Sequence, residues 1–230
     1  MLKRAGISLC VAVMIVAGPL LAQRGGMGMG MMPPSMNGLW NPVVGSGATY
    51  DMVGKDGKHQ VLTMAVVSKE DADGKTGYWM EYLINGEDGQ QSVMQMFMVK
   101  DGASMSVPKV IVQAGGRGPM LISAQMMGMM AARGGGAPPT PKSDFTEGAE
   151  KVGNESLTTP GGTFDTMHWR NKNGDQAWLS PKAGPWSFVK SVSADGSTMT
   201  LVKIVTDAKS HVTGTPVPIE SMMGGRRGQD

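Results

Sequence analysis

The amino-acid sequence predicts a mainly β protein of about ten short antiparallel strands, interrupted by one apolar helix. Turn signals rich in Gly, Pro, Asn and Asp recur about every 8–12 residues, and the segments between them alternate apolar with other residues. One segment, residues 119–132, instead has the composition of a helix. Together these observations favour a sandwich, a barrel or a half-barrel.

The first residues, 1–22, are predicted to be a signal peptide. Lys3 and Arg4 precede an apolar run that ends at Ala22, as in an export signal, and the run is too short to predict a membrane span. Cys10 lies inside this run, without the small residue before it that a lipoprotein signal needs. We therefore expect an exported, unlipidated protein, periplasmic or secreted, with no transmembrane span or disulfide after signal removal.

The charge balance argues against a nucleic-acid partner. The chain has 21 Lys and Arg and 19 Asp and Glu, and the predicted signal peptide carries two of the basic residues, Lys3 and Arg4. Removing it leaves 19 of each sign, so the net charge is near zero. A nucleic acid would require a basic surface.

A single folded domain is predicted between two irregular ends. Residues 23–38 are Gly, Met and Pro without periodicity, which predicts a disordered linker. Residues 39–206 hold the expected strands and the helix, which a Gly/Pro linker at 133–142 follows. Residues 207–230 show no further core segment, so we expect a flexible tail there.

The strands before the helix run in order from Val43. Asp56-Gly57 predicts the first hairpin turn, because Asp-Gly readily takes the positive φ that tight hairpins need. In the third and fourth strands, alternation assigns one face to Tyr78, Met80, Tyr82, Ile84, Met94, Met96 and Met98. Phe97 and Val99 make the opposite face of the fourth strand apolar too, so we expect it to be covered on both sides. Pro108 marks an edge or a bulge in the fifth strand.

The predicted helix, 119–132, has almost no polar face. Pro119 suits a first helical position, whereas Gly128 weakens the centre. A soluble helix of this kind must be buried or lie in an apolar trough. Beyond it, from Ala149 to Lys203, four or five further strands are predicted, with one of the turns at Pro181 to Pro185.

The segments GTFDTMHWR, DQAWLSPKAGPWSFVKS and STMTLVK, with YWMEY and KVIVQAGGRGPM before them, resemble a group of exported bacterial domains of unknown function, DUF4412-like. The resemblance covers roughly residues 43–206. It implies a lipoprotein-carrier-like (LolA/LolB-type) half-barrel, that is, a strongly curved antiparallel sheet with the helix on its concave face. In such carriers an acyl chain can sit between the sheet and the helix.

The chain has 23 methionines, and several of them are expected to line the space between the sheet and the helix. Methionine makes a deformable apolar surface that accepts ligands of variable shape. We expect a floor formed by Met80, Tyr82, Met94, Met96 and Met98, and a lid formed by Met126, Met127, Met129 and Met130. The predicted function is non-enzymatic periplasmic binding of an apolar or lipid-like ligand, or of a lipidated protein, without a cofactor. The alternative is an ordinary core that binds nothing, as in a structural envelope module.

A second alternative is Cu(I) binding, because clustered thioethers are soft ligands. Its best site is the set Met27, Met29, Met31 and Met32 in the linker. The three histidines show no metal-ligand spacing. Ser106 with Lys109 matches S-x-x-K, a motif of penicillin-recognising enzymes. The companion K-T-G motif, at Lys75, comes before it instead of after it, and the third motif of these enzymes is missing, so we expect no enzyme.

Overall fold

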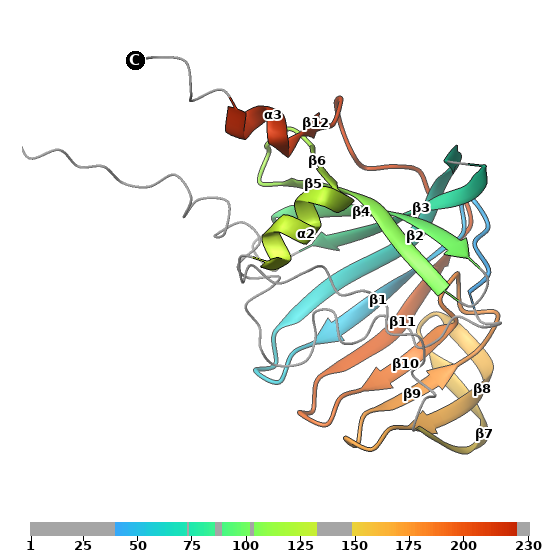
Figure 1. Ribbon diagram of the computed structural model, residues 1–230. Coiled ribbons are helices and arrows are strands. Elements are labelled where there is room, and N and C mark those ends of the chain that lie inside the picture. The colour runs from blue at the N-terminus through green and yellow to red at the C-terminus, as the bar shows by residue number, and fades with distance from the viewer. Residues whose placement is uncertain (1–39, 73, 86–88, 102–103, 133–148, 225–230) are drawn as a thin grey trace, which may run out of the picture.

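The computed structural model describes residues 40–72, 74–85, 89–101, 104–132 and 149–224. Twelve strands form one sheet in the order β12-β6-β5-β4-β3-β2-β1-β11-β10-β9-β8-β7. Figure 1 shows this sheet as a strongly curved surface, with helix α2 on one side of it and β7 and β8 at its far end. The predicted fold class, a β half-barrel with an apolar helix over its concave face, is confirmed, with twelve strands in place of about ten.

The first half of the chain makes a meander. Its strands are β1 (Gly47–Val53), β2 (His59–Ala72), β3 (Lys75–Asn85), β4 (Gln91–Asp101), β5 (Ser104–Ala114) and β6 (Met120–Ser123). Each pairs antiparallel with the next. The Asp56-Gly57 turn between β1 and β2 is confirmed, with Gly57 at φ 77° and its N–H bonded to the Gly54 carbonyl at 2.8 Å.

The second half adds a second meander. Its strands are β7 (Glu150–Thr159), β8 (Gly162–Arg170), β9 (Gln176–Leu179), β10 (Phe188–Val192) and β11 (Thr198–Val205), and β12 (Val217–Pro218) and α3 (Ile219–Gly224) follow them in the chain. Strand β11 pairs antiparallel with β1, so the two meanders share one continuous sheet.

Bulges explain the curvature of the sheet. Register shifts interrupt the β1–β11, β2–β3, β4–β5, β7–β8 and β9–β10 ladders. An extra residue on one strand of a pair bends that strand and increases its twist. The β4–β5 shift lies where Val107 and Pro108 oppose the single residue Met98, which confirms that Pro108 marks a bulge.

Two apolar clusters lie on the two faces of the sheet. The inner cluster, on the concave face, contains Trp40, Tyr50, Met64, Met80, Tyr82, Met96, Met98, Met127, Phe164, Trp186, Phe188 and Leu201 among others. The outer cluster, on the convex face, contains Trp79, Phe97, Val99 and Ile111. The alternation predicted for β3 and β4 therefore divides their side chains as expected, and β4 is apolar on both faces.

The helix begins later than predicted. Residues Met120–Ser123 form β6, which pairs with β5, and α2 spans only Ala124–Ala132. Met and Leu favour a helix locally, but pairing with the exposed edge of β5 overrides that preference. Ser123 ends the strand and caps the helix, since its Oγ accepts a hydrogen bond from the N–H of Met126 at 3.3 Å.

The C-terminal residues differ from the expected flexible tail. Residues 206–216, here called the C-terminal strap, run along the convex face, and β12 then pairs in parallel with β6. The carboxylate of Glu81 accepts hydrogen bonds from the His211 N–H at 2.9 Å and from Gln95 Nε2 at 2.7 Å. Val212 packs against the outer cluster. The predicted segments 1–22, 23–38 and 133–142 lie outside the described residues.

Candidate functional site

Methionine side chains form the floor of the concave face. Met64 on β2, Met80 on β3, and Met96 and Met98 on β4 are all at most 6% exposed, and half-buried Met94 packs against them. Their positions follow from the two-residue period of β3 and β4, and the register places Met80 opposite Met96. The floor is therefore the apolar, deformable surface that the sequence predicts.

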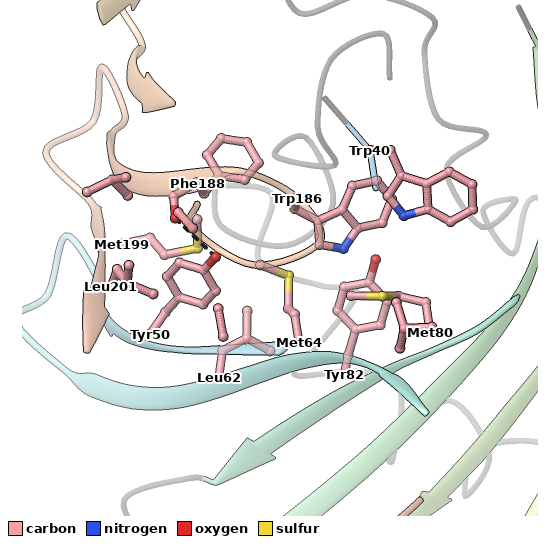
Figure 2. Packing of buried hydrophobic residues seen from close by; sticks show 14 of the residues in the cluster. Trp40, Tyr50, Leu62, Met64, Met80, Tyr82, Trp186, Phe188, Met199 and Leu201 are labelled. Carbon is pink, nitrogen blue, oxygen red and sulfur yellow. Dashed lines mark hydrogen bonds between the residues drawn. The ribbon is translucent and has the colours of Figure 1, made fainter. Parts of the chain in front are cut away.

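A compact loop between β9 and β10 covers the neighbouring part of the concave face. Residues 180–187 are closed by a hydrogen bond from the Ser180 N–H to the Ser187 carbonyl at 2.7 Å, and Ser187 has φ 60°. A Cβ added at Gly184, which has φ 74°, would lie 3.0 Å from Ala48 Cβ, so the loop backbone rests directly on β1. This close approach carries Trp186 into the inner cluster, where it is 2% exposed (Figure 2).

Aromatic rings continue from this loop toward β3. Trp40 stacks on Trp186 with ring centroids 5.9 Å apart and an interplanar angle of 24°. Its other neighbour is Tyr78, whose ring meets Trp40 edge-on at 5.7 Å. Ring contacts of both kinds are favourable geometries. They fix where the polar atoms of the two indoles lie.

Three buried polar atoms meet beside this stack without a partner. They are Trp40 Nε1, Trp186 Nε1 and Tyr82 Oη, each on a side chain at most 8% exposed. Figure 2 shows the Tyr82 hydroxyl pointing toward the two stacked indoles, and Trp186 Nε1 is close enough to influence the pKa of Tyr82. We call the three atoms the polar trio. A further buried indole without a partner, Trp169, belongs to β8.

The electrostatics of the trio follow from burial. Removal from water raises the pKa of Tyr82 well above its ordinary value, and the adjacent Trp186 N–H opposes this only in part. Tyr82 is therefore a neutral hydroxyl across the physiological range. Although Trp186 Nε1 is close enough to affect this pKa, the two atoms do not meet hydrogen-bond geometry. An indole N–H can only donate, so the trio offers more donors than acceptors.

Tyr50 provides the contrast inside the same cluster. It is fully buried on β1, and burial likewise raises its pKa. Its hydroxyl, however, donates to the Phe188 carbonyl at 3.2 Å, shown as a dashed line in Figure 2. Buried polar groups in proteins normally have such a partner, so the trio is an exception that calls for an explanation.

Helix α2 covers the floor through a single described methionine. Met127 is 8% exposed and belongs to the inner cluster, whereas Met126 is buried outside both clusters. Met129 is 40% exposed, which corrects the prediction that it faces the floor. Residues 127 and 129 are about 200° apart around a helix, so both cannot point inward. The side chain of Met130 lies outside the described part of the structure.

The N-terminal end of α2 is hydrogen-bonded to the C-terminal helix, α3. Ser123, its N-cap, donates a hydrogen bond from Oγ to Glu220 Oε1 on α3 at 2.6 Å. This bond lowers the pKa of the Glu220 carboxyl. The cover is thus short, about 13 Å for nine residues, and this bond joins its first turn to α3.

The predicted site residues are partly brought together. Those that join the inner cluster are Met80, Tyr82, Met94, Met96, Met98 and Met127. Sequence reasoning missed Trp40 and Trp186 as members of the site, because both lie in segments without regular periodicity. A tryptophan between Pro185 and Ser187 in a turn-rich stretch was the available signal, since a large ring in a short loop needs somewhere to be buried.

Among the described residues, no group of three His, Cys, Asp or Glu side chains is placed to hold a metal ion. Both ring nitrogens of His168 face side-chain oxygens, with Nε2 2.9 Å from Gln176 Oε1 and Nδ1 3.2 Å from Glu155 Oε1. The Cu(I) candidates Met27, Met29, Met31 and Met32 lie outside the described residues. That alternative stays a prediction, which Cu(I) titration with and without residues 24–36 would test. In the described residues, no helix has the length and apolarity needed to cross a membrane.

Comparisons with solved structures give distant neighbours. A lipoprotein candidate from Parabacteroides distasonis shares 14% identity over 72% of this chain and 97% of its own, with a TM-score of 0.36. An exported-protein candidate with a YmcC-like fold from Bacteroides fragilis shares 14% identity over 72% and 98%, with a TM-score of 0.35. MucB shares 13% identity over 74% and 57%, with a TM-score of 0.27.

Similarity at this level carries no functional argument. No family model matches the sequence, and no curated protein matches it either. The DUF4412-like resemblance therefore stays a prediction. The function has to be argued from the concave face itself.

Proposed function

We propose that the protein is an exported, non-enzymatic binding protein. It takes an apolar or lipid-like ligand, or the acyl chain of a lipidated protein, on the concave face beneath α2. The observation that carries the proposal is the gathering of Met64, Met80, Met96, Met98 and Met127 between the curved sheet and a short helix. Unbranched thioether side chains can repack around a guest more easily than branched ones.

The cover makes exchange of a guest feasible. Helix α2 has nine residues, and Gly128 at its centre lowers its intrinsic stability by about 1 kcal/mol relative to Ala. Displacing the helix would expose two buried methionine side chains, Met126 and Met127. Each methylene of a guest that replaces it contributes about 0.8 kcal/mol, so an acyl chain of moderate length would compensate for the displacement.

Native mass spectrometry of the full chain, purified from cells without detergent, provides the first test. We expect a bound mass in the range of a lipid or fatty acyl compound. The second test is uptake of the neutral probe N-phenyl-1-naphthylamine, whose fluorescence rises in apolar surroundings. Bare chain in the first experiment and no uptake in the second would reject the proposal and leave a structural module.

A matched pair of variants on α2 locates the site. Met127→Lys places a charge in the inner cluster, and we expect probe affinity to fall about tenfold or more. Met129→Lys changes the same helix at an exposed position, and affinity should stay within about twofold. Far-UV circular dichroism confirms that both variants fold. Equal losses for the two would place the probe somewhere other than beneath the helix.

A further inference from the structure

The polar trio specifies the kind of ligand, an inference that rests on the proposed function. We propose that the N–H of Trp40 and the O–H of Tyr82 bind one neutral oxygen acceptor, the carbonyl oxygen of an acyl ester or amide, while Trp186 Nε1 donates to Tyr82 Oη in the bound state. All three atoms are buried and lack a partner in the structure. They come from three separated segments, namely the start of the domain, β3 and the loop before β10.

The number of hydrogen-bond donors in the trio shows that the ligand atom must be an acceptor. Two indole N–H groups can only donate, and the tyrosine hydroxyl can do either. If Trp186 donates to Tyr82 Oη, the N–H of Trp40 and the O–H of Tyr82 still need an acceptor. A carbonyl oxygen has two lone pairs and satisfies both. A ligand amine or other pure donor satisfies neither.

The apolar surroundings of the trio favour an uncharged ligand group. Apolar side chains pack around the trio, and no Lys or Arg is among the buried residues in the described part of the chain. A carboxylate placed there would lose its hydration without gaining a cation, at a cost of several kcal/mol. A neutral carbonyl loses far less and gains two hydrogen bonds. An ester or amide is therefore preferred over an ionised fatty acid.

The position of the trio fits an acyl compound. Tyr82 shares its strand face with Met80, and both pack in the cluster that contains Met96 and Met98. The trio is thus adjacent to the methionine floor and continuous with it (Figure 2). A chain lying on the floor brings the carbonyl at its head within reach of the two tryptophans.

Competition for N-phenyl-1-naphthylamine tests the inference. The competitors are methyl octanoate, the chain-matched decane, N-methyloctanamide and, at pH 8, octanoate, each compared at equal free concentration. We expect the ester or the amide to bind at least about threefold more tightly than decane, and octanoate to bind more weakly than the ester. The stronger of the ester and amide arms identifies the source of the carbonyl.

Two isosteric variants sharpen the result. Tyr82→Phe should reduce the advantage of the ester over decane by about threefold to tenfold. Tyr50→Phe removes a buried hydroxyl that already bonds Phe188 and should leave that advantage unchanged. If the probe binds but wild-type protein prefers decane or does not distinguish it from the ester, the trio holds no ligand carbonyl and the proposed function stands alone. If neither the probe nor any competitor binds, the proposed function itself fails.

Discussion

Two tyrosines in one cluster allow the unpaired state of the polar trio to be measured as a stability difference. Tyr50 and Tyr82 are both neutral, both at most 8% exposed and both part of the inner cluster. They differ in their hydroxyls, since Tyr50 donates to the Phe188 carbonyl and Tyr82 has no partner. Replacing each with phenylalanine removes one oxygen and leaves the ring in place.

The two replacements should affect the free energy of unfolding differently. Tyr50→Phe removes a buried hydrogen bond and leaves the Phe188 carbonyl short of a donor, which should cost about 1–2 kcal/mol of unfolding free energy. Tyr82→Phe removes a hydroxyl whose desolvation no bond offsets, so stability should stay level or rise by up to about 1 kcal/mol. The gap between the variants is then about 1–3 kcal/mol, and each kcal/mol shifts Tm by about 2–4 °C for a chain of this size.

The assay is urea unfolding of ligand-free protein, followed by both far-UV circular dichroism and tryptophan fluorescence. Ligand must be removed first, by unfolding and refolding, because anything bound to the native state adds its own stability. Coincident transitions from the two probes justify a two-state analysis. A loss for Tyr82→Phe as large as that for Tyr50→Phe would mean that the Tyr82 hydroxyl is paired, and the trio would no longer require a ligand.

The remaining predictions concern two glycines and one ion pair. Gly77→Ala should destabilise by about 1–3 kcal/mol in thermal melts, because the added Cβ would overlap the Phe97 ring, and an unchanged Tm would contradict that contact. Gly128→Ala, where a Cβ meets nothing within 4 Å, should stabilise by about 0.5–1 kcal/mol and slow probe exchange if α2 is the cover. Hydrogen bonds from Lys109 and from the Trp79 indole lower the pKa of Glu70. Its contribution to stability, present above the unfolded pKa of about 4.3, is lost as the pH falls through the lower folded pKa, and it is less than about 1 kcal/mol because the side chain is 39% exposed. Glu70→Gln should remove that part of the acid dependence of the urea midpoint.

Strand faces could be predicted where a local period decides them. The alternation in β3 and β4 assigns Met80, Tyr82 and Met96 to one face and Phe97 to the other, and the clusters agree. Burial of one face fixes the register, because a shift by one residue would invert every side chain. The floor of the candidate site was therefore within reach of sequence reasoning.

Contacts between segments that are distant in the chain could not be predicted from the sequence. Trp40 and Trp186 meet by stacking, although they are far apart in the chain and neither has a periodic neighbourhood. The C-terminal strap is held by polar contacts, one of which joins His211 to Glu81. In the sequence, a polar stretch with no apolar pattern has the character of a flexible tail. Met129 shows a third limit, because the phase of a helix cannot be read from a run that is apolar all round.

The two faces of the sheet are covered in different ways, and this argues for the concave one as the place of a ligand. On the convex face the strap lies over the outer cluster, and the buried carboxylate of Glu81 bonds both Gln95 and His211. Removing a partner from a buried carboxylate is strongly destabilising, so that cover is firmly held. On the concave face, the described residues that form the cover are the 180–187 loop and a nine-residue helix with a central glycine, and three buried polar atoms in the inner cluster lack partners. Under the proposed function, a guest bound on this face would supply the acceptor that these atoms lack.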